Sequence, residues 1–250
     1  MQTSQGVMAI FAMPRPDTCS FAQRVTVPIT VICDNVRDPG NLGTIIRTCA
    51  AVGCDRLVAM KGCVDIWDPK VIRSGMGGHF RLPILNDIGW ETIANHLPDS
   101  SQIFLADHKY SFGEENSVLN DDPSKKMFEE MLEKRKQIGK LEQDRSYSPV
   151  NNRFLPLYKK IPINHQSIWQ AFSNIKSTEH TTIIIGGETE GISLQARKLT
   201  IESNGKIVYI PLLNDVESLN VSIALSVILF QLRKSYEDLV EKSYSNKSKE

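Results

Sequence analysis

Apolar runs of strand length alternate with helical patterns along most of the chain. Runs rich in β-branched residues predict strands at 25–34, 56–60, 80–85, 102–107, 181–187 and 205–211. Apolar positions at helical spacing predict helices at 41–53, 68–75, 90–97, 167–175, 193–199 and 218–240. Strands that alternate with helices are typical of a mostly parallel sheet with helices on both faces. The sequence therefore predicts an α/β fold of this kind.

A polar, charge-rich stretch interrupts the pattern between about residues 109 and 166. Its segment 121–145 has alternating charges and few large apolar residues, so nothing in it requires a core. Because the α/β pattern resumes afterwards, we interpret the stretch as an insertion within one domain that covers residues 25–242. Residues 243–250 are expected to form a disordered tail.

Composition narrows the function classes only slightly. The 250 residues carry a formal net charge of zero, which is weak evidence against a strongly basic nucleic-acid binder but is compatible with a local basic patch. The five cysteines contain no CxxC pair, so we interpret them as small buried apolar residues, and we expect no metal. No apolar run approaches the roughly 20 residues that a membrane span needs, so we expect no membrane association.

The first of three polar motifs follows the first predicted strand. The turn sequence DPGN ends at Asn41, which is placed to cap the next helix. Arg47 falls on the second turn of that helix, among apolar residues. Two interpretations stay open: a capped core helix whose arginine extends to water, or a helix N-terminus that serves as an anion site.

The second motif is IIIGGETEGIS, at 183–193. An apolar strand ends in Gly186 and Gly187, and Glu188 and Gly191 follow. Glycines at the carboxyl end of a strand let a ligand approach the backbone, although a tight turn with exposed glutamates is the alternative. The motif matches neither GxGxxG nor a Walker loop, and its carboxylates would repel phosphate. It therefore favours a neutral or cationic ligand.

The third motif is IPLLNDVESLNVSIALS, at 210–226. A predicted strand ends near Ile210 and Pro211, and a loop then leads to Ser218, Leu219 and Asn220 at the start of the last helix. Ser218 fits an N-cap position, which is the simplest interpretation. The loop is also a third polar segment at the carboxyl edge of a strand, where open α/β sheets bind ligands.

Together and in this order, the three motifs resemble those of SpoU-type RNA 2′-O-ribose methyltransferases, members of the SPOUT superfamily. The stretch 61–84 is similar to the branch that methylates a guanosine ribose in mitochondrial large-subunit rRNA. The opening TSQGVMAIFAMP is similar to the segment that joins the family's N-terminal RNA-binding domain to its catalytic domain. Residues 1–24 are therefore expected to be a linker, with the upstream domain and transit peptide absent from this chain.

The resemblance implies a fold and a set of functional residues. The fold has a deep trefoil knot in its C-terminal part, which is a rare exception to the rule against threaded chains. S-adenosyl-L-methionine is expected in the knot, in contact with Gly186, Gly187, Gly191, Ile210, Pro211 and Leu219. The implied catalytic residues are Arg47, Asn41, Glu188, Ser218 and Asn220. The implied partners are mitochondrial large-subunit rRNA and a second copy of the chain, with the active site at the dimer interface and the mitochondrial matrix as location.

The role of Arg47 and two rival functions stay open. The resemblance implies that Arg47 is a general base acting with the RNA phosphate, yet a guanidinium pKa above about 12 makes its neutral form scarce. We hypothesise that Arg47 instead holds the adjacent phosphate and stabilises the emerging alkoxide. A tRNA 2′-O-methyltransferase would carry the same motifs. A non-catalytic ribosome-assembly factor with this fold would not need the five candidate residues intact.

Overall fold

The computed structural model describes residues 26–98, 100–107, 163–173, 175–176, 179–214 and 216–247, together with Ile10 and Met13. In this part of the chain seven strands form one sheet in the order β3-β2-β1-β6-β4-β7-β5, and every recorded strand pairing is parallel. The strands are β1 (Val27–Asp34), β2 (Cys54–Met60), β3 (Ile84–Ile88), β4 (Ser101–Ala106), β5 (His165–Ser167), β6 (His180–Gly186) and β7 (Lys206–Tyr209). The predicted α/β fold is confirmed.

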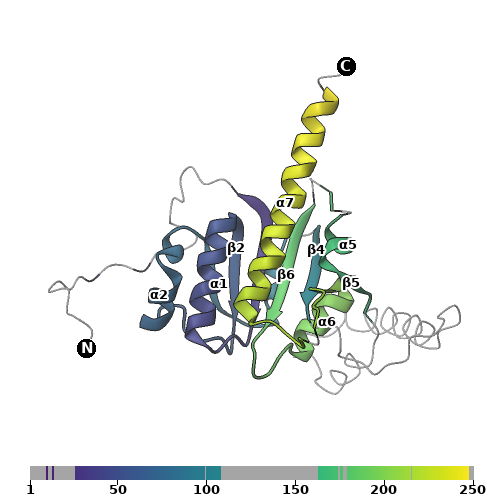
Figure 1. The fold of residues 1–250 in the computed structure, drawn as a ribbon. Helices are drawn as coiled ribbons and strands as arrows, with labels where there is room; N and C mark the ends of the chain where they lie inside the picture. Colours follow the sequence, from purple (N-terminus) through teal and green to yellow (C-terminus); the bar gives the residue numbers. More distant parts are fainter. Residues whose placement is uncertain are drawn as a thin grey trace, which may run out of the picture.

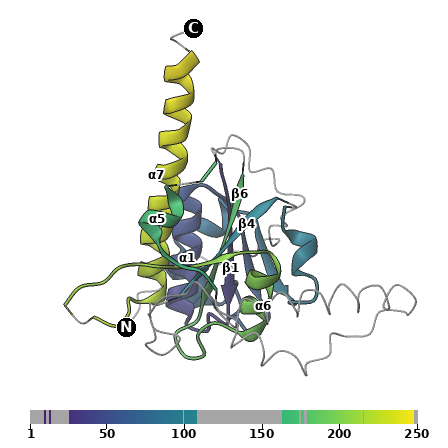
Figure 2. The same cartoon turned by 90° about the vertical axis from the view of Figure 1, so that its right-hand side faces the viewer.

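Helices cover both faces of the sheet (Figures 1 and 2). They are α1 (Pro39–Val52), α2 (Pro69–Gly75), α5 (Ile168–Phe172), α6 (Leu194–Glu202) and α7 (Val221–Lys247), with 3₁₀ turns η1 (Gly78–Phe80) and η2 (Ile93–His96). One buried cluster packs α1, α5 and α7 on one face, and a second cluster packs α6 and η2 on the other. Val31 and Ile32 belong to opposite clusters, so β1 is apolar on both faces, as is usual for a central parallel strand.

Four elements differ from the sequence-based prediction. Strand β3 begins at Ile84 rather than at residue 80, because Phe80 closes a 3₁₀ turn. The helix predicted at 90–97 is reduced to the four-residue turn η2. The edge strand β5 was missed, since it lies at the end of the charge-rich stretch. Helix α7 continues to Lys247, beyond the predicted end at 240. Residues 109–162, and 1–24 apart from Ile10 and Met13, lie outside the described residues.

The register of the parallel strands brings their carboxyl ends to one edge of the sheet. Asp34 at the end of β1 is aligned with Gly186 at the end of β6. Ala106 of β4 is aligned with Ile185 on one side and Val208 on the other. The segments that follow these strands therefore emerge at the same edge, which is where open α/β sheets bind ligands.

Helix α2 lies tightly against α1. The Ser74 hydroxyl donates to the backbone oxygen of Pro39 at 3.1 Å, and a side chain at Gly43 would collide with Ser74. Helix α2 ends in a turn at the residues that follow Gly75. Met76 and Gly77 have φ angles of 47° and 81°, the left-handed conformation that closes many helices.

The cysteines of the described part are free thiols. Cys33, Cys49 and Cys54 are buried, as predicted, while Cys63 is partly exposed and Cys19 lies outside the described residues.

Across the same described ranges, no group of three or more His, Cys, Asp or Glu side chains is arranged to hold a metal ion. None of the helices found there has both the length and the apolar character needed to cross a membrane.

Candidate functional site

Three side chains from the three sequence motifs meet at the carboxyl edge of the sheet. The amide nitrogen of Asn41 donates to Glu188 Oε1 at 2.9 Å. The amide nitrogen of Asn220 donates to the same carboxylate oxygen at 2.7 Å and to Asn41 Oδ1 at 3.1 Å. We call Asn41, Glu188 and Asn220 the polar triad. It joins segments that lie 147 and 179 residues apart in the sequence.

Asn220 also caps helix α7. Its Oδ1 accepts from the backbone N–H of Ser222 at 3.0 Å and from the Ser222 hydroxyl at 2.6 Å. Because these groups donate to Oδ1, the amide nitrogen of Asn220 must face the triad. The prediction that Ser218 caps this helix was wrong, since the helix begins at Val221 and Ser218 lies in the preceding loop.

Helix α1 is capped by Asp38, not by Asn41. The Asp38 carboxylate accepts from the backbone N–H of Asn41 at 2.7 Å, and Pro39 occupies the first turn, where a missing N–H does no harm. The predicted capping role of Asn41 was therefore wrong. This correction leaves the Asn41 side chain available for the triad.

Asp34 is hydrogen-bonded to the second motif, and the sequence did not lead us to predict it as a site residue. The buried carboxylate accepts from the backbone N–H of Ser193 at 2.7 Å and from the amide nitrogen of Asn35 at 3.1 Å. Its backbone oxygen accepts from the N–H of Gly187 at 2.8 Å. Burial raises the pKa of Asp34 above its ordinary value, although the hydrogen bonds from Ser193 lower it. An acidic residue ending an otherwise apolar strand was the available signal.

The glycines of the second motif serve chain packing more than was expected. A Cβ at Gly186 would lie 2.6 Å from the backbone oxygen of Gly191, and one at Gly187 would collide with the backbone of Asn35. These two glycines therefore allow the strand end to approach protein backbone, not only a ligand. Gly191 differs, because its φ of 63° favours glycine and no atom lies within 4 Å of its added Cβ.

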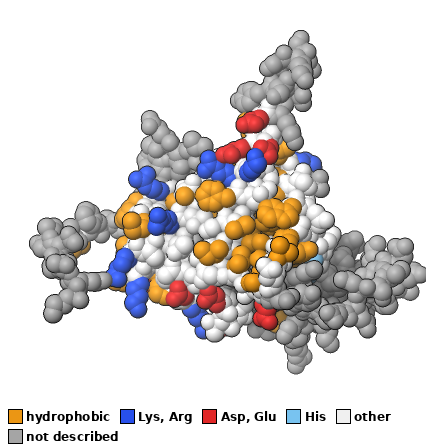
Figure 3. All heavy atoms as spheres, viewed as in Figure 1, with side chains coloured by type: hydrophobic (Ala, Val, Ile, Leu, Met, Phe, Trp, Pro, Cys, Tyr) orange, Lys and Arg blue, Asp and Glu red, His pale blue; other side chains and the backbone are white. Residues whose placement is uncertain are grey.

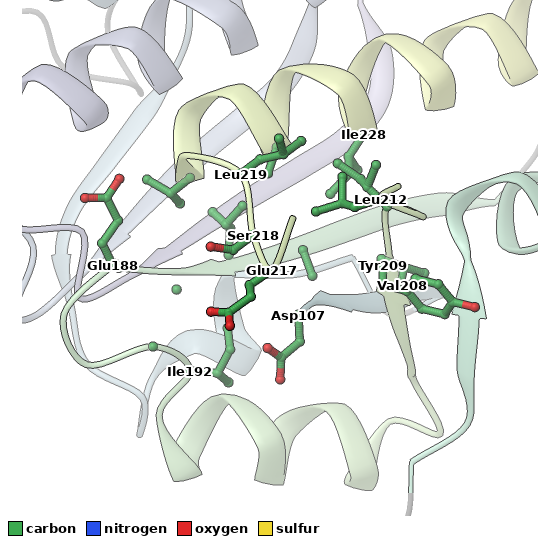
Figure 4. Close-up of a pocket in the computed structure, with 18 of the residues that line it drawn as sticks. Asp107, Glu188, Ile192, Val208, Tyr209, Leu212, Glu217, Ser218, Leu219 and Ile228 are labelled. Carbon is green, nitrogen blue, oxygen red and sulfur yellow. The ribbon is translucent and has the colours of Figure 1, made fainter. Parts of the chain in front are cut away.

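A cavity of about 920 Å³ opens beside the triad (Figure 4). All six predicted cofactor contacts line it, namely Gly186, Gly187, Gly191, Ile210, Pro211 and Leu219. Glu188 and Ser218 line it too. Asp107 and Glu217 add carboxylates to the wall that sequence reasoning did not find, and both are visible in Figure 4. The volume falls within the roughly 300–1,000 Å³ typical of small-molecule sites.

Arg47 lies apart from this cavity. Its side chain is exposed on α1, is not among the cavity-lining residues, and forms no hydrogen bond or ion pair with any described residue. Its neighbour Thr48 contacts Ser226 of α7 through their hydroxyls at 3.2 Å. Within one chain the structure therefore brings together four of the five predicted catalytic residues, and Arg47 is the exception.

Comparison with known families gives this arrangement a context. The model of the SpoU rRNA methylase family matches residues 28–126 and 158–230, which include all three motifs. The chain belongs to the SpoU rRNA methylase family. The family match covers the polar triad, the cavity and nearly all of the sheet, so the resemblance stated from the sequence is confirmed.

Similar proteins are known from animals and bacteria. Mouse and human proteins named rRNA methyltransferase 3, mitochondrial, are 36% and 37% identical over 95% of the chain, which matches 55% and 56% of their length. The chain thus spans about half the length of these curated SpoU-family relatives. The structure of the SpoU methyltransferase AviRb from Streptomyces viridochromogenes, in complex with AdoMet, is 20% identical with a TM-score of 0.55. It covers 90% of this chain and 67% of AviRb, and it supports the fold.

Asp34 predicts a pH-dependent change in stability. The pKa of Asp34 is raised in the folded state, so the ionised carboxylate lowers the free energy of unfolding at pH values above that pKa. This destabilisation disappears as the pH falls through the folded-state pKa. Relative to an Asp34→Asn variant, the wild-type protein should gain unfolding free energy as the pH falls from about 7 to about 4. Urea unfolding of both proteins at a series of pH values measures this change in unfolding free energy. A pH-independent difference between the two proteins would contradict the assignment.

Proposed function

We propose that this protein transfers a methyl group from S-adenosylmethionine to a ribose 2′-oxygen, that of a guanosine, in mitochondrial large-subunit rRNA. The observation that carries the proposal is the cavity, whose wall contains all six expected cofactor contacts beside a triad drawn from all three motifs. The names of the mouse and human relatives favour mitochondrial rRNA over tRNA as substrate and the mitochondrial matrix as location.

The cavity has the chemistry that the cofactor requires. Its wall combines apolar side chains such as Ile185 and Leu219 with backbone groups of the glycine motif. The carboxylates of Asp107, Glu188 and Glu217 suit a ligand that carries positive charge. When bound, S-adenosylmethionine supplies a methyl group that its sulfonium has already activated. The chain's own task is to align the acceptor oxygen and to stabilise the charge on it.

A trefoil knot is part of the proposal. The segment 210–220 leaves β7, which pairs with β4, and ends where Asn220 contacts Glu188 and Asn41. The chain therefore crosses the carboxyl edge of the sheet before α7 packs beside α1. This course is compatible with the threading that the family resemblance implies. A crystal structure with continuous density over residues 186–221 would decide whether the segment passes through a loop.

The triad acts as a positioning device in this proposal. Glu188 accepts from both amides through one oxygen, so the first turn of α1 and the start of α7 are tied to the same carboxylate. Ser218 and Leu219, which line the cavity, precede Asn220 directly and are placed by the same contacts. Alignment of two reactants can supply roughly 7–11 kcal/mol of a barrier. The triad is therefore expected to act on alignment more than on proton transfer.

Arg47 binds the RNA and stabilises charge. Its guanidinium holds the phosphate next to the acceptor ribose and stabilises the negative charge that develops on the 2′-oxygen as its proton leaves. Its side chain is exposed and forms no ion pair with the described residues, which suits a group that binds an anionic substrate. A planar guanidinium grips phosphate through two parallel hydrogen bonds, which an ammonium group lacks.

A homodimer completes the proposed site. Helix α7 exposes Ile223, Val227 and Phe230, at 52%, 36% and 52%, spaced to lie on one face of the helix. Ser226, between them in the sequence, contacts Thr48, the neighbour of Arg47. Two copies paired through this face would place Arg47 of each subunit near the other subunit's surface. We infer that Arg47 serves the cavity of the partner, because it does not line the cavity of its own chain.

Arg47→Lys tests the role of the guanidinium. The variant keeps a positive charge but loses the planar fork, so single-turnover methylation should fall by roughly 10²- to 10³-fold, as when an oxyanion donor is removed. S-adenosylmethionine affinity, measured by calorimetry, should not change. Near-normal single-turnover methylation would show that the fork is not needed.

Subunit mixing tests the shared site. Arg47→Ala and Asn220→Ala are each expected to be inactive as homodimers. If Arg47 acts in the partner's cavity, a randomly exchanged equal mixture contains heterodimers with one intact site, and about a quarter of wild-type activity returns. If both residues serve the same cavity, every site in the mixture is damaged and no activity returns. Methylation before and after subunit exchange distinguishes the two results.

Mapping of 2′-O-methyl groups tests the substrate. Loss of the protein should remove a ribose methylation from mitochondrial large-subunit rRNA and leave mitochondrial tRNA unchanged. Wild-type protein should restore the mark, and the Arg47→Lys variant should not. A missing tRNA mark with intact rRNA would favour the rival tRNA enzyme, and unchanged rRNA and tRNA would favour a non-catalytic factor.

A further inference from the structure

An exposed apolar surface with unpaired cations adjoins Arg47. Phe80, Met76 and Ile72 are 61%, 69% and 40% exposed. Lys70 and Arg73 share the short helix α2 with Ile72. Their side chains are exposed and have no ion-pair partner among the described residues. Figure 3 shows blue Lys and Arg side chains interspersed with orange apolar ones along the edge where α2 lies. We call these five residues the α2 surface.

The α2 surface is held against the helix that carries Arg47. A Cβ at Gly78 would lie 3.2 Å from both the Cα and the backbone nitrogen of Arg47, so η1 touches the backbone of α1 at that residue. Phe80 ends the same turn, closed by its N–H donating to the Gly77 oxygen at 3.1 Å. The Phe80 backbone is therefore within one 3₁₀ turn of the contact with Arg47.

Aromatic packing fixes the Phe80 ring. The ring of Trp67 lies 6.3 Å from Phe80 and 5.2 Å from His79, both tilted. His79 Nε2 donates to the Ile66 oxygen at 2.8 Å, and burial lowers the pKa of His79, so this support is uncharged near neutral pH. Phe80 thus rests on other rings and leaves most of its own surface to solvent.

The neighbouring carboxylates form no ion pair with the cations of the α2 surface in the described part of the chain. Asp68 accepts from the backbone N–H of Lys70 at 2.7 Å, and Asp65 accepts from that of Trp67 at 3.0 Å. Both acids are therefore turned to backbone at the start of α2, and neither forms an ion pair with Lys70 or Arg73. Positive charge beside an exposed aromatic ring is the usual combination for single-stranded nucleic acid.

We propose that the α2 surface binds RNA nucleotides that flank the acceptor ribose, with a base stacked on Phe80 and a phosphate held by Arg73. This inference rests on the proposed function, because it assigns the substrate contact next to Arg47. Stacking accepts any base, so the contact supplies affinity and places the strand, while it does not select a sequence. The α2 surface also explains how a protein with zero net charge attracts a polyanion.

Binding of two short labelled strands to the full-length protein tests the stacking. One strand is an oligoadenylate, and the other has the same ribose-phosphate backbone without bases. Wild-type protein should bind the oligoadenylate more tightly, and Phe80→Ala should weaken that binding by about 5- to 100-fold while changing abasic binding little. Phe80→Trp should keep the preference. Trp169→Ala is the matched control, because Trp169 is 49% exposed on α5, on the opposite side of the molecule (Figure 1).

Salt dependence separates the phosphate contact from the stacking contact. Arg73→Gln should weaken binding of both strands equally and reduce the slope of log affinity against log salt by about one. An unchanged preference in Phe80→Ala, or full affinity in Phe80→Leu, would overturn the stacking proposal. A change in molecular mass of Phe80→Ala, measured by light scattering, would assign the surface to protein contact and would also overturn it.

Measurements on wild-type protein and Phe80→Ala distinguish a failure of this proposal from a failure of the proposed function. Wild-type protein that neither binds S-adenosylmethionine nor methylates rRNA would refute the function, whatever the strand preference. Wild-type protein that does both, with Phe80→Ala unaffected in the Michaelis constant for rRNA, would refute only the α2 surface. The expected result is a raised Michaelis constant for rRNA in Phe80→Ala with a maximal rate and cofactor affinity close to wild type.

Discussion

One carboxylate holds the candidate site together. Glu188 accepts from Asn41 and Asn220, so a single anion fixes the ends of two helices and the glycine motif. A hydrogen bond to a charged group contributes about 1.5–3 kcal/mol at most, and less where the partners are exposed to water. The triad therefore matters more for positioning these segments than for stabilising the fold. Without Glu188, Asn41 and Asn220 would keep their contact with each other and Asn220 would still cap α7, but both would lose their hydrogen bond to the second motif.

The sheet makes this arrangement possible by aligning strand ends. Asp34 and Gly186 are paired neighbours, and Asp34 then binds the glycine motif through Ser193 and Gly187. A buried carboxylate is costly, yet this one accepts hydrogen bonds from the backbone N–H of Ser193 and from the side-chain amide of Asn35. The core is thus connected to the motif by a polar anchor. Gly186 also packs closely against Gly191, because a Cβ added there would lie 2.6 Å from the backbone oxygen of Gly191.

Sequence patterns predicted six of the seven strands in the described sheet and most of the helices, because these depend on local periodicity. The six expected cofactor contacts came from the family resemblance, and all six line the cavity. Sequence reasoning failed where long-range contacts decide. Asn41 and Ser218 both fit capping positions by sequence, but Asp38 and Asn220 perform the capping, since the helices begin two residues before and three residues after the predicted caps. Strand β5 was missed because pairing with β7, not its own apolar content, makes it a strand. The ring support of Phe80 depends on Trp67, thirteen residues earlier.

Asn220 has two roles at once. Its side-chain oxygen caps α7, and its side-chain nitrogen completes the triad with Asn41, 179 residues earlier, and Glu188, 32 residues earlier. As the ribosome synthesises the chain from its N-terminus, Asn41 and Glu188 are both made before Asn220, the residue that contacts them both. The site is therefore assembled last, when the final helix forms. A chain that ends just before Asn220 therefore contains every strand of the described sheet and still lacks the polar triad.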